Sequence, residues 1–265
     1  MYHANYHTHS HFCRHFKGTE REIVEKAIEN GITKLGFSDH SPQVFRNGYT
    51  EGMRMGLDEI SSYVGLIREL REEYKNDIEI YVGFEGEYLP SIFDGLYDIC
   101  KEYDIDYMIM GQHQLEYPGG LTYERVFSEE IIHTVKSFVN TVIEGMETGC
   151  FSYIGHPDVY NWHAAPRDEY VTEMTRLCVR AKELNIPLEV NNLGHTEKRH
   201  YPGDLFFGIA KEVGNSIVVG IDAHSPDQVN PEDINSTIEY AESLGLPIVK
   251  EITMLHPWRD GKTPT

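Results

Sequence analysis

The chain lacks a long apolar segment. No uninterrupted apolar run in the sequence approaches the roughly 18 residues that a membrane-spanning helix needs. There is no basic region followed by an apolar stretch at the amino terminus, and no Pro/Ser-rich linker, low-complexity tract or fixed-period repeat divides the chain. We therefore expect a soluble, cytoplasmic protein with no membrane partner and one domain over residues 1–265.

Several catalytic motifs are also missing. The chain has no Gly-x-Ser-x-Gly elbow and no phosphate-binding P-loop, which argues against a serine hydrolase and a nucleotide kinase. It has no Cys-x-x-Cys pair, so neither a zinc knuckle nor a disulfide framework is indicated. We expect reduced, mostly structural thiols at its 4 cysteines, which are Cys13, Cys100, Cys150 and Cys178.

Basic residues are scarce. The chain carries 23 Lys and Arg against 43 Asp and Glu, which gives a formal net charge of -20. This charge would repel the phosphates of nucleic acids and the surface of an anionic membrane, so a nucleic-acid partner is disfavoured. Bound cations could offset part of it.

Histidines and acids follow short apolar runs. In His7-Thr8-His9 the two imidazoles lie two residues apart, which in an extended strand places both on one side of the backbone, where they can bind one cation. Taken alone this pair is weak evidence, because a solvated strand shows the same alternation. Histidines and acidic residues also follow later apolar runs, at Asp39-His40, Glu85, His113, His156 and Asp222-Ala223-His224.

The apolar patterns predict alternating helices and strands. Thr19 to Glu22 form a capping box that begins a helix, and Gly31 ends it. Further helices are expected at 57–74, 96–102, within 124–148, and at 169–184, 204–213 and 231–244. After an opening strand, β-rich runs stand at 34–38, 78–84, 107–110, 152–154, 188–190, 217–221 and 247–250.

Seven or eight strands that alternate with helices are typical of a parallel β/α barrel of this length. The carboxyl ends of barrel strands converge on one face, so scattered polar residues could meet there around a few ions. An open doubly wound sheet is the alternative, but its ligands would gather at one switch point and come from fewer strands.

The motifs, taken in order, resemble those of the polymerase and histidinol phosphatase (PHP) family of metallophosphoesterases. The matching segments cover nearly the whole chain, and the Phe-Cys-x-His continuation is most similar to the histidinol-phosphatase branch. They are His7-Thr8-His9-Ser10, Phe12-Cys13-Arg14-His15, Gly36-Phe37-Ser38-Asp39-His40-Ser41-Pro42, Gly83-Phe84-Glu85, Gly155-His156-Pro157-Asp158 and Gly220-Ile221-Asp222-Ala223-His224.

The resemblance implies a distorted (β/α)7 TIM-like barrel, an α/β fold, that holds two to three divalent ions. A first ion would be bound by His7, His9, Glu85 and Asp222. Glu85 would bridge to a second ion at His113 and His156, and a third would lie at His15, His40 and His224. Imidazole and carboxylate ligands suit zinc, manganese or iron, and no cysteine is expected near the site.

The reaction that the resemblance implies is the hydrolysis of L-histidinol phosphate in histidine biosynthesis. Clustered cations bind phosphate oxygens and lower the pKa of a bound water, so a hydroxide that bridges the ions is the expected nucleophile. Glu85, Asp222 and His224 are the candidate catalytic residues.

Substrate contacts are less clearly marked. Arg199 follows Asn191-Asn192 and could hold phosphate oxygens with its planar fork, or it could be an ordinary surface arginine; Asn191 is the second candidate. Arg167 is weaker, and Glu116 could meet a substrate ammonium. The segments Gly111-Gln112-His113-Gln114 and Val159-Tyr160-Asn161-Trp162 depart from what we expect of a histidinol phosphatase.

Each ligand also has a structural interpretation, as a hydrogen-bonded histidine or a capping acid. Asp39, Glu87 and Asp158 could orient ligands or cap backbone. Two other functions stay open: a PHP phosphoesterase for another small phosphate or a nucleic-acid end, and a noncatalytic metal-binding barrel. The histidines outside the motifs are interpreted as structural: His3, His11, His133, His163, His195, His200 and His256.

Overall fold

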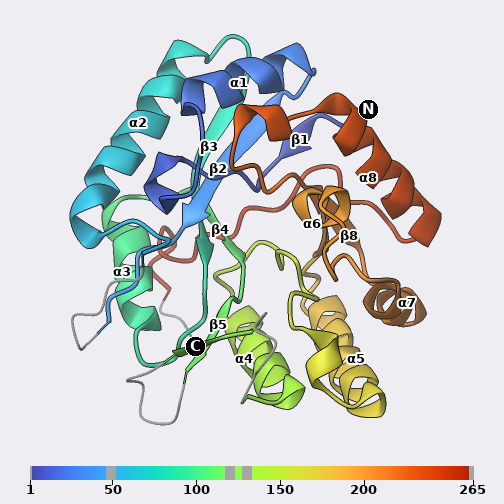
Figure 1. Cartoon of the computed structure of the whole chain (residues 1–265). Helices are drawn as coiled ribbons and strands as arrows, with labels where there is room; N and C mark the ends of the chain where they lie inside the picture. The colour runs from blue at the N-terminus through green and yellow to red at the C-terminus, as the bar shows by residue number, and fades with distance from the viewer. Residues whose placement is uncertain (1, 46–51, 117–122, 127–132, 263–265) are drawn as a thin grey trace.

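The computed structural model of the chain describes residues 2–45, 52–116, 123–126 and 133–262 (Figure 1). Its centre is a parallel sheet of the strands β1 (Ala4–Asn5), β2 (Lys34–His40), β3 (Glu79–Gly86) and β4 (Tyr107–Met110), in that order. A second parallel pair joins β7 (Leu188–Asn191) to β8 (Ile217–Gly220).

Isolated bridges connect these two groups of strands. Ile154 pairs with Met110 at the end of β4 and with Leu188 in β7, and Thr8 pairs with Ala223 just beyond β8. The sheet is therefore parallel and curls round, so that the first and last strands approach each other at their carboxyl ends.

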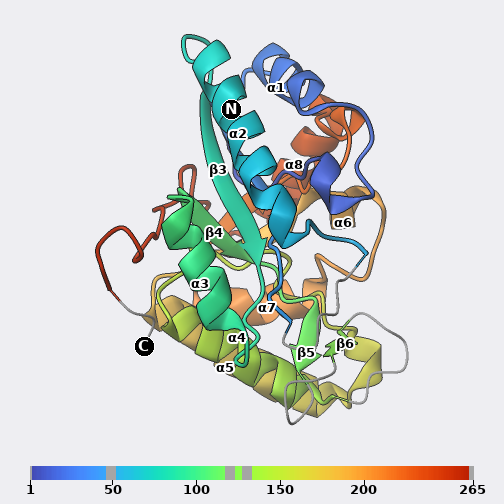
Figure 2. The ribbon, with the colours of Figure 1, turned by 90° about the vertical axis from the view of Figure 1, so that its left-hand side faces the viewer.

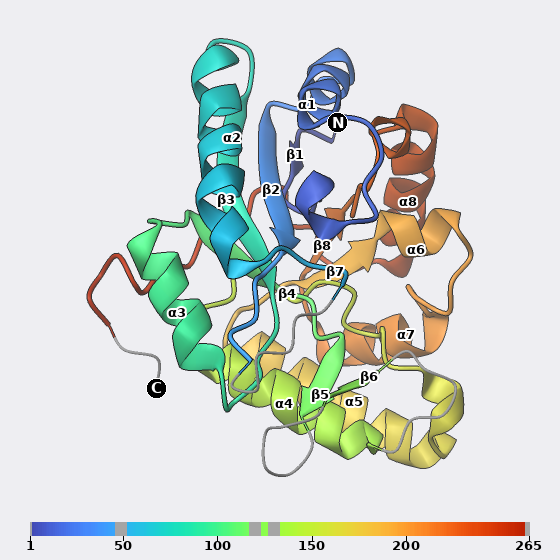
Figure 3. The same ribbon diagram turned by 60° about the vertical axis from the view of Figure 1, so that its left-hand side comes forward.

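Helices cover the outside of the curled sheet, as Figure 1 shows. They are α1 (Glu20–Glu29), α2 (Ile60–Glu73), α3 (Phe93–Glu102), α4 (Val135–Glu147), α5 (Arg167–Glu183), α7 (Asp204–Val213) and α8 (Pro231–Leu244), with the short α6 (Asn192–Thr196) after β7. Short 3-10 turns occur at η1 (His11–Cys13), η2 (Leu57–Glu59), η3 (Trp162–Ala164) and η4 (Pro226–Gln228). Figure 3 shows α1 and α2 beside the strands β1 to β3.

Most of the expected elements are confirmed. The helices at 204–213 and 231–244 and the strand at 107–110 have the bounds that the sequence predicts. Thr19 and Glu22 form the expected capping box, in which each side chain accepts a hydrogen bond from the other residue's backbone N–H. The helix within 124–148 is α4, and residues 127–132 of that range lie outside the described residues.

Some elements differ from the prediction, and the short helix α6 was not expected. The runs at 152–154 and 247–250 contribute only the bridges of Ile154 and Ile248, because their neighbours do not extend the ladder. An antiparallel hairpin of β5 (Gln114–Glu116) and β6 (Tyr123–Arg125) was not expected. Figure 2 shows this hairpin beyond the carboxyl end of β3.

Aromatic side chains fill the space inside the sheet. The Tyr107 side chain lies against Gly36 and Gly83, where an added Cβ would come within 2.1 Å of its hydroxyl oxygen and 2.4 Å of its ring, respectively. The hydroxyl donates to the Tyr6 carbonyl at 2.8 Å. Only glycine leaves room for this ring. This packing supports the strands from inside, so that their carboxyl ends are held in fixed positions. Among the described helices, none is long and apolar enough to cross a membrane.

Candidate metal centre

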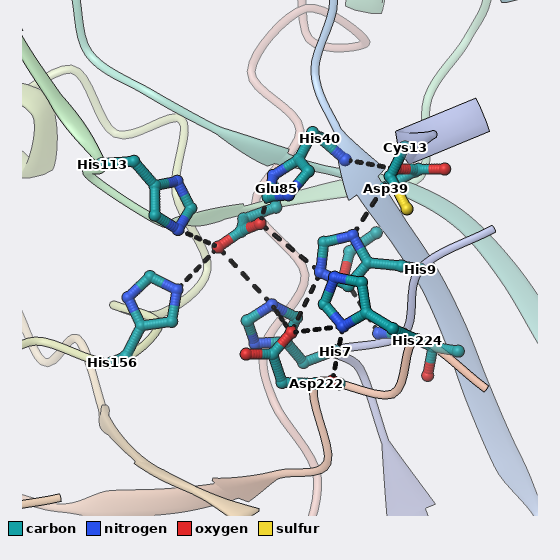
Figure 4. A network of polar contacts seen from close by, with 12 residues as sticks. His7, His9, Cys13, Asp39, His40, Glu85, His113, His156, Asp222 and His224 are labelled. Atoms are coloured by element: carbon teal, nitrogen blue, oxygen red, sulfur yellow. Dashed lines mark hydrogen bonds and ion pairs between the residues drawn. The ribbon is translucent and has the colours of Figure 1, made fainter. Parts of the chain in front are cut away.

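Histidines and carboxylates converge at the carboxyl ends of the strands, as Figure 4 shows. His7 and His9 follow β1, His40 ends β2, Glu85 lies near the end of β3, and Asp222 follows β8. His113 lies between β4 and β5, His156 follows the bridged Ile154, and His224 comes two residues after Asp222. The strand-end convergence expected from the sequence is thus present.

Glu85 is the centre of this cluster. It is buried, and five imidazoles approach its carboxylate. Oε1 lies 2.8 Å from His156 Nε2, 3.4 Å from His113 Nε2 and 3.5 Å from His7 Nε2, while Oε2 lies 2.8 Å from His40 Nδ1 and 3.6 Å from His9 Nε2. One carboxylate therefore contacts residues of all three expected ligand sets.

Asp222 is a second carboxylate that histidines approach. Its Oδ1 lies 3.0 Å from His9 Nε2 and 3.4 Å from His7 Nε2, which brings together the expected ligands of the first ion. The His224 ring stacks on that of His9 with the centroids 3.8 Å apart, and the exposed His15 ring lies 4.5 Å from that of His224.

The donor set fits divalent cations. Ligating atoms of His7, His9 and Glu85 lie within 4.8 Å of one another, and so do those of His9, His40 and His224. His7 Nε2, His9 Nε2 and Glu85 Oε2 are buried and have no hydrogen-bond partner within the described part of the chain. Buried polar atoms are normally paired, so these atoms fit direct ligation of an ion.

The pKa shifts show strong coupling within the cluster. Burial opposes the charge on Glu85, but His113, His40 and His7 outweigh it and hold its pKa well below the usual range. Burial lowers the pKa of His113 to about 3 and that of His40 well below its usual value, and a neutral imidazole is the form that ligates a metal.

Two of the converging residues have an unusual backbone. His156 has φ 28° and Asp222 has φ 58°, in the left-handed region that residues other than glycine rarely adopt. These conformations turn both side chains toward Glu85 and His7 at the ends of their strands.

Other residues hold the ligands in position. Glu189 in β7 is fully buried and contacts His7 Nδ1 at 2.8 Å, which leaves Nε2 free to face Glu85 and Asp222. Glu189 was not among the residues predicted from the sequence. The available signal was an acidic residue within the apolar run Leu188-Glu189-Val190, where a buried carboxylate needs a partner. Asp39 lies 3.5 Å from His9 Nδ1, which fits the orienting role considered for it.

The expectation that no cysteine lies near the site is wrong. Cys13 is buried, and its sulfur lies within 4.8 Å of ligating atoms of His15 and His224. Cys13 ends the turn η1 and stands only two residues before His15, so its place in the sequence already indicated that it lies near an expected ligand. The four cysteines are free and buried, as expected.

A cavity of about 690 Å³ opens above the cluster, and Glu85, His113, His156, Asp222 and His224 line it. Arg199 also lines it; its Nε and Nη2 donate to Glu197 at 2.9 and 2.7 Å, and its Nη1 donates to the Tyr201 hydroxyl at 2.7 Å. His200, interpreted as structural, lines the cavity as well and contacts the Val159 carbonyl.

The other candidate substrate contacts lie elsewhere. Asn191 is buried; its amide donates to Glu189 at 2.9 Å and to Asp222 at 3.1 Å, and its Oδ1 accepts from Gly194 N. Arg167 is exposed at the start of α5. Glu116 accepts from Ser91 N. Among the described residues that line the cavity, Asn191, Arg167 and Glu116 do not occur.

The model of the PHP domain family matches residues 5–192 of the chain. The chain belongs to the PHP domain family. It is 27% identical over 228 residues to a "Probable histidinol-phosphatase" of Deinococcus radiodurans, a match that covers 84% of this chain and 86% of that protein. It is 23% identical over 233 residues to the histidinol-phosphatase of Lactococcus lactis, with 83% of each covered.

The PHP fold is also seen in solved structures. The chain is similar to the histidinol phosphate phosphatase of Lactococcus lactis, which was crystallised with zinc, L-histidinol and phosphate. The TM-score is 0.72 at 19% identity, and the match covers 95% of this chain and 99% of that one. At this identity the similarity concerns the fold, which agrees with the curled parallel sheet described above.

Proposed function

We propose that this PHP protein is a metal-dependent phosphomonoesterase that hydrolyses L-histidinol phosphate to L-histidinol and phosphate. The observation that carries the proposal is the buried Glu85 carboxylate, which five imidazoles approach from separate segments beneath an open cavity. The names of its curated relatives support the choice of substrate and its place in histidine biosynthesis.

The ligand sets follow the contacts within the cluster. His7, His9, Glu85 and Asp222 would hold a first ion, and Glu85 would share a second with His113 and His156. His15, His40 and His224 would hold a third. Two to three zinc, manganese or iron ions would, when bound, neutralise the phosphate charge and activate water for attack.

The chain's own residues prepare the site for this chemistry. Glu189 and Asp39 orient His7 and His9 through contacts of 2.8 and 3.5 Å. Asn191 donates to Asp222, so its contribution to substrate binding would be indirect. Arg199 faces the cavity with a planar fork that suits a phosphate, which would compete with Glu197 for its N–H groups.

Two finer features belong to the same proposal. The bridge between Thr8 and Ala223 supports a closed, distorted (β/α)7 barrel in the single domain expected over residues 1–265, since it joins the segment after β1 to the segment after β8. Four free, buried cysteines fit a reducing compartment such as the cytoplasm.

The test is phosphate release from L-histidinol phosphate by protein reconstituted with zinc or manganese, measured against a panel of other phosphate monoesters. We expect a strong preference for histidinol phosphate. Glu85→Ala should abolish turnover, because it removes the carboxylate shared by the ligand sets. Glu173→Ala is the matched control, since Glu173 is a buried carboxylate of α5 that pairs with Arg176 instead.

Equal turnover of all monoesters would contradict the substrate assignment and favour a phosphoesterase of broader specificity. Full metal content without hydrolysis of any phosphoester would contradict the enzymatic function and favour a noncatalytic metal-binding protein.

A further inference from the structure

Arg54 is a buried arginine in the wall of the cavity. Its residue exposure is 6%, and it lines the cavity alongside Glu85 and His113. The guanidinium donates from Nη1 to the Ser41 carbonyl at 3.0 Å and from Nη2 to the Glu87 carboxylate. An ion pair that served packing alone would not need to face this cavity.

The position of Arg54 is fixed through Glu87. Glu87 is also buried, and its Oε2 accepts from Gln114 N at 2.8 Å while its Oε1 lies 3.9 Å from His113 Nδ1. His113 Nε2 in turn lies 3.4 Å from Glu85 Oε1. The guanidinium therefore lies on the His113 side of the metal centre.

Arg199 also lines the cavity, and its contacts lead to His156. Its Nη1 donates to the Tyr201 hydroxyl at 2.7 Å, and the Tyr201 ring lies 5.7 Å from the His156 ring, between centroids. His156 Nε2 is 2.8 Å from the same Glu85 Oε1 that faces His113. Arg54 is thus linked to His113 through Glu87, and Arg199 is linked to His156 through Tyr201.

We propose that Arg54 is a second phosphate-binding residue, which holds the phosphoryl group of the substrate together with Arg199. This inference rests on the proposed function in so far as the substrate is a phosphate monoester. The cavity has Glu85, Asp222 and Glu197 in its wall, and these carboxylates repel a phosphate dianion. A guanidinium offsets this repulsion and matches phosphate oxygens with paired N–H donors.

The contacts of Arg54 favour such a role. Glu87 and the Ser41 carbonyl hold the terminal nitrogens, so the side chain loses little conformational freedom when a ligand arrives. Arg199 is different, because its side chain is 40% exposed and its partner Glu197 is 48% exposed. Arg54 is the pre-oriented cation of the two, and Arg199 is the one that must exchange partners.

The experiment measures binding of inorganic phosphate to the zinc-loaded full chain by calorimetry, with zinc content determined for every variant. Loss of a charge-assisted hydrogen bond should weaken phosphate binding by about 10- to 100-fold in Arg54→Gln. Arg54→Lys keeps the charge but loses the fork, so its phosphate affinity should fall between those of the wild type and Arg54→Gln.

Arg71→Gln is the matched control. Arg71 makes the same pair of contacts, to a carbonyl (Ile80) and a carboxylate (Asp106), but it lies on α2, away from the residues that line the cavity. Its phosphate affinity should equal that of the wild type.

Unchanged phosphate affinity in Arg54→Gln and Arg54→Lys would overturn the inference. So would Arg54→Gln losing zinc while Arg54→Lys keeps both zinc and wild-type phosphate affinity, since Arg54 would then act only through Glu87. Because the ligand is inorganic phosphate, a failure to hydrolyse histidinol phosphate would contradict the proposed function without affecting this result.

Discussion

The variant Glu189→Gln tests whether Glu189, which is not a proposed ligand, orients the proposed metal ligand His7. Glu189 Oε1 lies 2.8 Å from His7 Nδ1, while Oε2 accepts from His156 N and from the Asn191 amide, both at 2.9 Å. Both oxygens thus face donors. Glutamine has the same shape but only one acceptor oxygen, so either His7 or the other two donors must face an N–H₂ group.

The side chain cannot turn away from this conflict. A Cβ at Gly220 would lie 1.9 Å from Glu189 Oε1, which shows how closely β8 packs on the carboxylate. One unsatisfied buried donor costs about 1–3 kcal/mol, so the metal-free variant should unfold at a lower temperature. His7 also loses the carboxylate that fixes its tautomer, and metal affinity should fall about 10- to 100-fold.

The assay is competition for zinc with a chromophoric chelator, together with thermal unfolding of the metal-free protein. Glu20→Gln is the control, because Glu20 is buried and contacts His11 Nδ1 at 2.7 Å outside the cluster. If Glu189→Gln bound zinc as tightly as the wild type, the orienting role of Glu189 would be refuted.

Two further predictions concern space and pH. Gly111→Ala should lower zinc content and activity, because a Cβ there would lie 1.9 Å from Glu85 Oε1; Gly65→Ala, at an open position in α2, should keep both and add about 0.5–1 kcal/mol of stability. Burial raises the pKa of Asp158 from 3.8 to about 7, so the folded metal-free protein holds a proton that the unfolded chain releases, and stability falls as pH rises between these values. Asp158→Asn should flatten this fall in thermal unfolding measured against pH, and equal slopes for the two proteins would argue against a buried, protonated Asp158.

The sequence predicted those parts of the fold that depend on local patterns. Helices α7 and α8 begin and end where expected because apolar periodicity and capping residues mark both ends. The convergence of most candidate ligands was predictable, since they follow strand-like runs and belong to motifs of the resembled family; their binding of metal stays a prediction. The hairpin β5–β6 was not, because its three-residue strands are defined by their pairing with each other.

The residues that orient the candidate ligands are placed by strand register and long-range contacts, which the sequence pattern does not reveal. Glu189 pairs with Val218 in the β7–β8 ladder and reaches His7 only because β1 and β8 meet at Thr8 and Ala223. Arg54 likewise reaches the cavity through contacts with Ser41 and Glu87, residues 13 and 33 positions away. Such long-range pairs have no periodic signal.

The two ends of the sheet differ in a way that stability alone does not explain. Toward the amino end, Tyr107 packs inside the sheet against Gly36 and Gly83. Trp258 is buried there, and its Nε1 donates to the Ile105 carbonyl at 2.8 Å. At the carboxyl end lie imidazole nitrogens with no partner among the described residues, a carboxylate surrounded by histidines, and left-handed backbone at His156 and Asp222. The unpaired buried nitrogens and the left-handed backbone destabilise the metal-free fold. Because they occur together beneath one cavity, and the bound cations would satisfy the unpaired atoms, this end of the sheet is better explained by ligand binding than by packing.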